Sequence, residues 1–261
     1  MTPAKPLVRL VIPCLNEVAQ LEWSVNTCRA YLAKNFPYRW EVFVADNGSK
    51  DGTAELAERL SKQFPDVGYF TIPERGRGRA LRKAWSECDA DIVAYTDVDL
   101  STELVALEKL CRAIHEQGFD IATGSRLLPE SDIKRGPKRE FISRCYNLLI
   151  KAVLFTHFSD AQCGFKAVSR RVVRDVVPMI EDQAWFFDTE LLVLGEKQGY
   201  RIADVPVKWV DDDDSRVKIV STAWEDIKGV ARVRKFLWSA AFAAKKREVA
   251  AARSSESMAT R

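Results

Sequence analysis

Two aspartates near the middle of the chain have the types and spacing of a metal site. Asp97 and Asp99 follow the apolar run 92–96, where a strand-like segment gives way to a polar loop. In open α/β sheets, ligands bind at this end of the strands. Two carboxylates two residues apart can hold a divalent cation through hard oxygen ligands, and such a cation attracts a diphosphate. An isolated Asp-x-Asp also occurs in ordinary acidic turns, so the assignment depends on partners elsewhere in the chain.

Further acids follow two earlier strand-like segments. Glu17 comes after residues 7–13, and Asp46 comes directly after residues 40–45. Because the carboxyl ends of parallel strands share one edge of a sheet, we expect these acids to converge with the later aspartate pair. Carboxylates accept hydrogen bonds from the ring N–H groups of a nucleobase and from ribose hydroxyls. The pattern therefore favours a nucleotide beside the metal.

Glycines alternate with arginines after the third strand-like segment, where residues 74–82 are ERGRGRALR. The glycines allow the backbone to approach a ligand, and the arginines are suited to neutralising a diphosphate. The spacing does not match the Gly-x-Gly-x-x-Gly fingerprint of dinucleotide-binding folds. A solvated basic helix start is the alternative interpretation.

The elements that must position these residues alternate along the chain. Strand character recurs at 7–13, 40–45, 67–72, 92–96 and 121–123, and helical periodicity recurs at 21–32, 53–64, 78–87 and 104–117. This alternation predicts an α/β protein with a mostly parallel central sheet flanked by helices. Later segments predict helices at 141–158, 188–198 and 222–244 and a strand at 202–209. We expect a catalytic domain over residues 1–220, an amphipathic C-terminal helix over 221–246 and a disordered tail over 247–261.

Composition sets limits on the function. The 261 residues suffice for one core, and no apolar run reaches the roughly 18 to 20 residues of a membrane span. Six cysteines without a Cys-x-x-Cys pair indicate packed, reduced thiols, and the N-terminus lacks the apolar region of a signal peptide, so we expect a cytoplasmic protein. Two histidines are too few for a histidine-rich metal centre, and neither adjoins a candidate nucleophile.

The net charge of +3 is unevenly distributed. Residues 134–144 hold five basic side chains and one acid, and residues 232–247 hold six basic side chains and no acid. Such patches suit phosphate groups or an anionic membrane surface, and we expect no nucleic-acid partner. The periodic segment 141–158 is compatible both with a helix lying on a membrane and with a helix packed on the core.

Six segments, in order, resemble glycosyltransferase family 2 and, within it, the polyprenyl-phosphate (dolichyl-phosphate) sugar synthases. They are IPCLNE at 12–17, DNGSKDGT at 46–53, DVD at 97–99, GSR at 124–126, DAQCGFK at 160–166 and WFFDTELL at 185–192. The resemblance extends from about Leu7 to Ile219. It implies a GT-A fold, a nucleotide-sugar donor, a Mg²⁺ or Mn²⁺ ion, a lipid-phosphate acceptor and inversion at the anomeric carbon.

The resemblance also implies roles for individual residues. The residues with implied catalytic roles are Asp97, Asp99, Arg126, Arg139 and Asp188, of which Asp97 and Asp99 would hold the metal and the two arginines would meet the acceptor phosphate. The implied donor-binding residues are Pro13, Asn16, Glu17, Asp46, Asn47, Arg77, Gly78, Asp97, Glu190, Arg216 and Lys218. Two positions depart from the family pattern. Asn47 replaces the second acid of an Asp-Asp pair, and Ser101 stands where mannosyl relatives have a metal-binding glutamine.

The donor and the acceptor are assigned by the same resemblance. The segments 160–166 and 185–192 resemble the dolichyl-phosphate β-glucosyltransferase branch more than the mannosyl branch, which favours UDP-glucose over GDP-mannose. A polyprenyl or dolichyl phosphate is the expected acceptor, with peripheral attachment to the cytosolic face of a membrane. Three alternatives stay open, namely a GDP-mannose-dependent mannosyltransferase, the same fold acting on a soluble anionic acceptor, and a catalytically silent nucleotide-sugar sensor.

Overall fold

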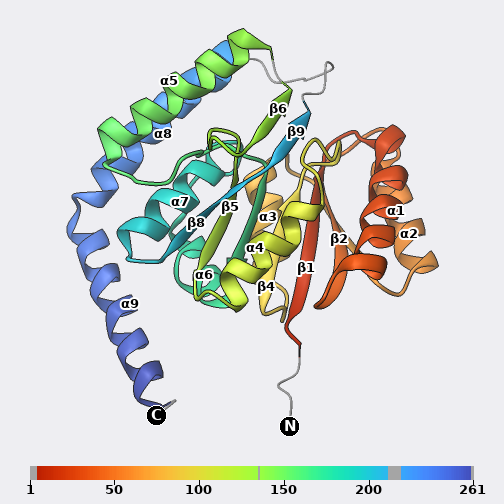
Figure 1. Ribbon diagram of the computed structural model, residues 1–261, viewed down its shortest axis with the longest axis horizontal. Coiled ribbons are helices and arrows are strands. Elements are labelled where there is room, and N and C mark those ends of the chain that lie inside the picture. Colours follow the sequence, from red (N-terminus) through yellow and green to blue (C-terminus); the bar gives the residue numbers. More distant parts are fainter. Residues whose placement is uncertain (1–4, 135, 211–218, 260–261) are drawn as a thin grey trace.

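A seven-stranded sheet forms the centre of the computed structural model, which describes residues 5–134, 136–210 and 219–259 (Figure 1). The strands lie in the order β3-β2-β1-β4-β7-β5-β8. Their bounds are β1 Leu7–Cys14, β2 Arg39–Asn47, β3 Val67–Ile72, β4 Ile92–Thr96, β5 Ile121–Ser125, β7 Phe165–Ser169 and β8 Ile202–Pro206. Only β7 runs antiparallel to its neighbours β4 and β5, so the prediction of a mostly parallel sheet flanked by helices is confirmed.

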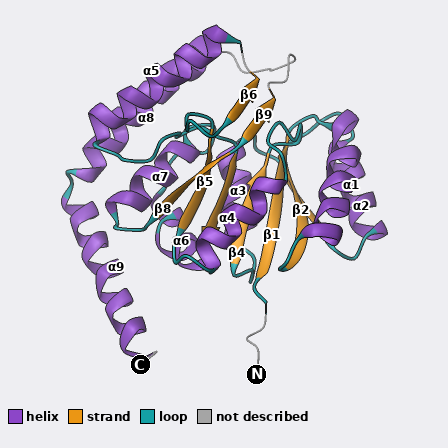
Figure 2. Ribbon diagram, in the orientation of Figure 1, coloured by secondary structure: helices purple, strands orange, loops and turns teal. Residues whose placement is uncertain are grey.

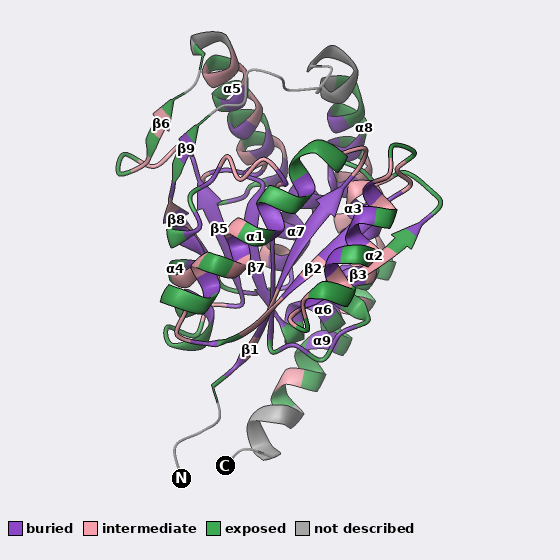
Figure 3. Ribbon diagram, turned by 90° about the vertical axis from the view of Figure 1, so that its right-hand side faces the viewer, coloured by how far each residue is buried: buried purple, intermediate pink, exposed green. Residues whose placement is uncertain are grey.

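Helices cover both faces of this sheet (Figure 2). One face packs against α1 Val18–Asn35, α2 Thr53–Gln63 and α4 Val105–His115. The other face packs against α3 Arg77–Ser86, α6 Arg170–Asp175 and α7 Phe187–Lys197, and a short 3₁₀ helix, Val177–Met179, follows α6. The inner strands of the sheet are mostly buried while the outer sides of the helices are exposed (Figure 3), as expected for an α/β fold with two apolar layers.

A second layer lies beyond the sheet. The helices α5 Pro137–Leu154 and α8 Ile219–Leu237 lie side by side, and α9 Ala240–Ala259 continues from the end of α8 (Figure 1). A two-stranded parallel sheet joins β6 Asp132–Lys134 to β9 Lys208–Val210. The six cysteines are unpaired, and all are buried except Cys145 on α5.

The strand register brings the predicted acids to one edge. Asp46 is level with Cys14 on β1 and with Thr71 on β3. Tyr95 on β4 is level with Val11, so Asp97, two residues further on, emerges at the same edge as the end of β1. The convergence expected from parallel strands is therefore present.

The structure differs from the sequence expectations at several elements, and the single helix expected over 222–244 is divided between α8 and α9. Strand β7 was not predicted, because its five residues contain a lysine and are too few for a clear period. The single strand expected over 202–209 is two strands with different partners, β5 for β8 and β6 for β9. The tail expected to be disordered is helical through Ala259, because its alanine-rich sequence favours a helix and Arg253 stacks 3.6 Å from the ring centroid of Tyr200. The division of the chain into domains stays a prediction.

Candidate active site

Arg77 joins two carboxylates at the carboxyl end of the sheet. Its Nη2 lies 2.7 Å from Oδ1 of Asp97, and its Nη1 lies 3.3 Å from Oδ2 of Asp188. Arg77 is in the first turn of α3 and Asp188 is in the first turn of α7, so the contact connects three elements far apart in sequence. The guanidinium also lies between two aromatic rings, 4.9 Å from the centroids of Tyr95 and Trp185. Two carboxylates and two aromatic rings therefore fix the position of the Arg77 guanidinium.

Asp188 is buried and receives donors on both oxygens. The Tyr95 hydroxyl donates to its Oδ1, and Nζ of the fully buried Lys166 lies 3.3 Å from the same atom. Since Arg77 faces the other oxygen, three partners surround this carboxylate. Such a carboxylate is suited to holding charged groups in place, and it is poorly placed to accept a proton from a substrate.

Burial governs the protonation of this cluster. Burial raises the pKa of Asp97 to about 6, with Asp99 and Asp188 adding to the increase and Arg77 opposing it. Burial also raises the pKa of Tyr95, and the neighbouring Asp188 raises it further. Tyr95 therefore stays a neutral donor, while Asp97 is mostly ionised at neutral pH.

The donor set at the strand end fits a divalent cation. Asp97 and Asp99 supply hard carboxylate oxygens, and Mg²⁺ sites commonly combine one or two carboxylates with phosphate oxygens of the substrate. Oδ1 of Asp99 accepts a hydrogen bond from the amide of Ser101, which orients its carboxylate. Within the described residues, no group of three or more histidine, cysteine, aspartate or glutamate side chains is arranged to hold a metal by itself. Phosphate oxygens would have to complete the coordination.

Asp46 is a candidate partner for a nucleobase. Its side chain is completely buried, and Oδ2 accepts a hydrogen bond from the Thr71 hydroxyl at 2.8 Å. Oδ1 is buried and has no hydrogen-bond partner among the residues that the structure describes. A buried carboxylate oxygen without a donor is costly, so a ligand N–H bound there would be favourable.

The neighbouring predicted donor residues make contacts within the chain. Asn47 donates to the carbonyl of Cys14 and accepts from the amide of Gly76, which connects the ends of β1 and β2 to the start of α3. Asn16 adopts a left-handed conformation with φ 56°, and its side chain accepts from the amide of Lys50. These residues shape the loops around the site.

Glu17, Pro13 and Gly78 also lie at this edge. The amide of Glu17 donates to the Thr53 hydroxyl, and Pro13 is buried near the end of β1. A Cβ atom built on Gly78 would lie 2.7 Å from Cβ of Phe187. The glycine thus allows α3 to approach the start of α7, whereas the sequence suggested that it allows the approach of a ligand.

Arg126 is locked in a buried ion pair. Its Nε and Nη2 donate to the two oxygens of Asp160 at 2.7 and 3.0 Å, and its backbone amide donates to the same carboxylate. Burial alone would raise the pKa of Asp160, but the charge and hydrogen bonds of Arg126 outweigh burial and hold the pKa at about 2. Arg126 therefore fixes the loop after β5 in addition to any contact with an acceptor. Arg139 lies nearby on α5, half-buried.

Glu190 holds a loop together. Its carboxylate accepts hydrogen bonds from the amides of Glu181 and Asp182 and from Nη2 of Arg232, the last at 2.6 Å. These contacts tie α7 to α8 and to the loop that precedes α7. Two further predicted donor residues, Arg216 and Lys218, lie outside the described residues.

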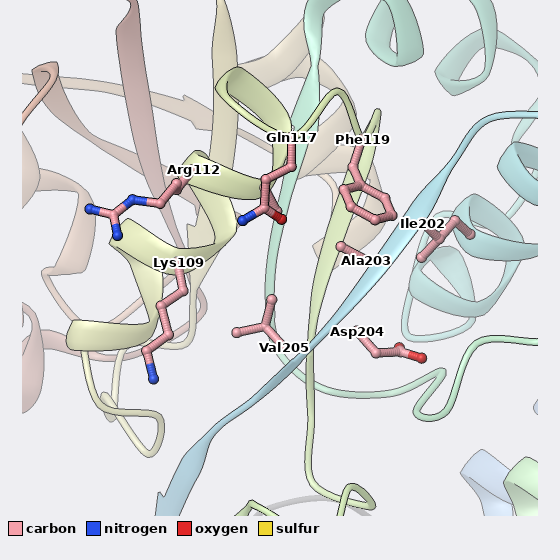
Figure 4. A pocket seen from close by; sticks show the side chains of 9 residues that line it. Lys109, Arg112, Gln117, Phe119, Ile202, Ala203, Asp204 and Val205 are labelled. Carbon is pink, nitrogen blue, oxygen red and sulfur yellow. The ribbon is translucent and has the colours of Figure 1, made fainter.

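Two grooves differ in their relation to these residues. One, of about 430 Å³, runs between α4 and the outer strand β8 and contains none of the predicted site residues (Figure 4). The other, of about 460 Å³, is mostly polar and is lined by Arg126, Leu127, Leu128, Pro129, Ser131, Ile133, Glu140 and Arg144. The second groove adjoins the basic residues expected to meet an acceptor.

Some residues of the site were not identified from the sequence. Lys166, Tyr95 and Asp160 surround the predicted residues, but their roles depend on the antiparallel strand β7 and on a buried pairing across 34 positions. Lys166 and Asp160 lie within one of the family segments, and that position was the only available signal.

The comparisons with known proteins establish the class. The chain belongs to glycosyltransferase family 2, because the family model described as "Glycosyl transferase family 2" matches residues 10–177. Among curated relatives, glycosyltransferase AglD of Haloferax volcanii is 37% identical over 221 residues, which cover 84% of this chain and 35% of AglD. Dolichyl-phosphate beta-glucosyltransferase ALG5A of Trichomonas vaginalis is 30% identical over 226 residues, which cover 83% of this chain and 70% of that protein. The chain thus spans about a third of the length of AglD.

Solved structures identify the fold. Glucosyl-3-phosphoglycerate synthase from Mycobacterium tuberculosis in complex with UDP superposes with a TM-score of 0.67 at 19% identity, covering 88% of this chain and 80% of that chain. The same enzyme in complex with Mn²⁺, UDP and glucosyl-3-phosphoglycerate superposes with a TM-score of 0.65 at 18% identity. The fold is GT-A, which confirms the expectation.

Over residues 5–134, 136–210 and 219–259, none of the helices combines the length and apolar character that crossing a bilayer requires.

Proposed function

We propose that this glycosyltransferase moves glucose from UDP-glucose to a polyprenyl or dolichyl phosphate, with inversion, on the cytosolic face of a membrane. The observation that carries the proposal is the Asp97–Arg77–Asp188 cluster, at the same edge of the sheet as Asp46, whose Oδ1 has no hydrogen-bond partner among the described residues. One part is suited to a diphosphate and the other to a nucleobase. The dolichyl-phosphate glucosyltransferases among the relatives support the same donor and acceptor.

The leaving group of this reaction is a nucleoside diphosphate. Asp97 and Asp99 would hold a Mg²⁺ or Mn²⁺ ion, which supplies positive charge to the departing diphosphate. Arg77 places a second, fixed positive charge at the same edge, because two aromatic rings and two carboxylates orient it. Preorganised charges of this kind typically contribute about 3 kcal/mol each to stabilising a transition state.

The nucleophile needs no protein base. An oxygen of the acceptor phosphate is already anionic at neutral pH, and it would form a bond to C1 of the sugar as the bond from C1 to the diphosphate breaks. Asp188 fits this scheme, since its oxygens are occupied by Tyr95, Lys166 and Arg77. The work of the chain is then to hold both phosphates in line and to exclude water.

The polar groove beside α5 is suited to the acceptor phosphate. Arg126 and Arg144 line it, and Arg139 is on the same helix as Arg144. Asp160 neutralises much of the charge of Arg126, and Glu140 pairs with Arg144 at 2.6 Å. Partly compensated arginines would aim an anionic nucleophile without binding it so tightly that it loses reactivity.

Helices α5 and α8 support attachment to a membrane surface. On α5 the polar side chains of Ser143 and Asn147 are buried, while Phe141 and Leu148 are 69% and 68% exposed. Ile150 and Leu154 of the same helix pack into the core, so α5 carries apolar side chains on its outer side in addition to its buried side. On the adjacent α8, the apolar side chains of Trp224 and Ile227 are exposed as well, and so is Trp238, which directly follows the helix.

The net positive charge of these two helices also supports attachment to a membrane surface. Helix α5 carries four basic residues and one acid, and α8 carries four basic residues and two acids. Exposed apolar side chains with an excess of cations are typical of helices that lie in the interface of an anionic bilayer.

The proposal is tested with purified protein and a matrix of donors and acceptors. UDP-glucose, GDP-mannose and UDP-galactose are each combined with polyprenyl phosphate or with 3-phosphoglycerate, with Mn²⁺, with Mg²⁺ or with a chelator. We expect metal-dependent glucosylation of the lipid from UDP-glucose. Transfer from GDP-mannose alone would overturn the donor, and transfer only to 3-phosphoglycerate would overturn the acceptor.

A further inference from the structure

Lys166 is a completely buried lysine in the centre of the sheet. It lies on β7, level with Tyr95 of β4 and Thr123 of β5, and none of its side chain reaches solvent. An ammonium group in such a place is costly unless it is paired and hydrogen-bonded. Its retention in the core therefore calls for an explanation.

The two oxygens of the Asp188 carboxylate have different partners. Nζ of Lys166 lies 3.3 Å from Oδ1 of Asp188 and also donates to the carbonyl of Cys163, while the Tyr95 hydroxyl donates to that same Oδ1. Oδ2 faces only Arg77 among the hydrogen bonds of the described residues, at 3.3 Å. Lys166 and Arg77 thus compensate one carboxylate from opposite sides.

Arg77 in turn is shared between two carboxylates. Its contact to Asp97, at 2.7 Å, is shorter than its contact to Asp188, at 3.3 Å. A guanidinium between two acids moves toward the one whose charge is less compensated, because the Coulomb attraction is strong where solvent is scarce. Without Lys166, Asp188 would be the less compensated acid.

We infer that Lys166 is a positioning residue that neutralises Asp188 and so keeps Arg77 directed at Asp97. The inference rests on the proposed function for its ligand, the diphosphate of UDP, and on the geometry of the core for the rest. Lys166 is buried and its ammonium group already has two partners, Asp188 and the carbonyl of Cys163, so we assign it no direct contact with a substrate. Its effect on binding would pass through Asp188 and Arg77.

The test removes the charge of Lys166 and then removes its partner. Lys166→Met keeps a long side chain without the ammonium, and we expect the Kd for UDP with Mn²⁺, measured by calorimetry, to rise about tenfold. Adding Asp188→Asn should bring the Kd back to within about threefold of that of Asp188→Asn alone. A lysine that only fills space would give losses that add up in the double variant, and this result would overturn the inference.

A matched control uses an ion pair outside the site. Arg29 on α1 pairs with Asp66 at 2.7 Å, and Arg29→Met should lower the free energy of unfolding without changing the Kd for UDP. If Lys166→Met does not fold, the double variant, which leaves no buried unpaired charge, still decides the question by comparison with Asp188→Asn. A Kd for UDP that is tenfold higher in the double variant than in Asp188→Asn would contradict the inference.

A crystal structure separates this inference from the proposed function. In a crystal structure of Lys166→Met, the position of Arg77 reports on the role of Lys166 whether or not a nucleotide binds. We expect Arg77 to leave Asp97 for Asp188 in the single variant and to remain on Asp97 in the double variant. If the wild-type protein binds no UDP, the proposed donor is wrong, and the position of Arg77 still tests the role of Lys166.

Discussion

Gly164 lies directly against the carboxylate of Asp97. A Cβ atom built on Gly164 would stand 1.9 Å from Oδ2 of Asp97 and 3.1 Å from Nη2 of Arg77. No side chain fits between the loop before β7 and this carboxylate. The glycine therefore sets how closely the loop packs behind the candidate metal site.

Gly164→Ala should displace Asp97 and reduce transfer about a hundredfold, because a shift of about 1 Å at a reacting centre has an effect of this size. The reduction is measured as the initial rate of lipid glucosylation at saturating UDP-glucose. Gly136→Ala is the matched control, since a Cβ atom there meets no atom of the described part of the chain within 4 Å. Equal rates for the two variants would show that Asp97 need not be held in this position.

Asp160→Asn should destabilise the fold in a pH-dependent way. The folded-state pKa of Asp160, about 2, lies below its ordinary value near 3.9, so its stabilising contribution is present above about pH 4 and is lost as pH falls toward 2. Removing one member of a buried ion pair costs about 3 to 5 kcal/mol. Urea unfolding at pH 7 and at pH 3 should show a larger difference between wild type and variant at pH 7. The same difference at both values would contradict the assigned pairing with Arg126.

Asp226 should make the stability of the wild-type protein depend on pH in the direction opposite to Asp160, and Asp226→Asn should remove this dependence. Asp226 is buried on α8 and accepts a hydrogen bond from Gln162, and burial raises its pKa to about 6, with Asp182 adding to the shift. Because the folded state then binds more protons than the unfolded state between about pH 4 and pH 6, wild-type stability falls as pH rises through this window.

The asparagine cannot ionise, so Asp226→Asn should have a higher Tm than wild type at pH 7.5 and a similar Tm at pH 4.5. Glu225→Gln is the control. Glu225 precedes Asp226 in the sequence, is exposed, and pairs with Lys228 at the surface. A variant that is less stable than wild type at pH 7.5 would show that the charge of Asp226 is satisfied in the folded state.

Membrane attachment is predicted to depend on exposed apolar side chains of α5 and of the residues that directly follow α5 and α8. Replacing Leu148, Phe155 and Trp238 by serine should reduce flotation with anionic vesicles at least tenfold, since each buried side chain contributes about 1.5 to 3 kcal/mol. Trp23→Ser with Val105→Ser removes similarly exposed side chains from α1 and α4 and should leave flotation unchanged. Equal flotation of the two proteins would place the membrane contact elsewhere.

The sequence allowed the framework of the site to be predicted because the relevant signals are local. Asp97 and Asp99 directly follow a buried strand, and Arg77 follows the third strand in a glycine-rich segment. The parallel order of β1, β2 and β4 then brings those strand ends together. Alternation of strands and helices was enough to predict each of these placements.

The inner contacts of the site could not be predicted because they depend on packing between distant segments. Lys166 meets Asp188 only because β7 inserts antiparallel between β4 and β5, which no short-range period indicates. Likewise, the pairing of Arg126 with Asp160 shows that an arginine assigned to a substrate also has a fixed partner in the core. A resemblance indicates which residues matter, whereas the structure shows what each one touches.

The most direct test of the account compares wild type with Asp99→Ala in one transfer reaction. Both proteins are given radiolabelled UDP-glucose, Mn²⁺ and polyprenyl phosphate, and the lipid phase is analysed for a mild-acid-labile glucosyl phosphate. We expect this product from wild type and none from Asp99→Ala, with the variant folded as judged by its Tm. Undiminished, metal-dependent formation of the lipid product by Asp99→Ala would contradict the assigned site, and the absence of lipid product from wild type would contradict the proposed reaction.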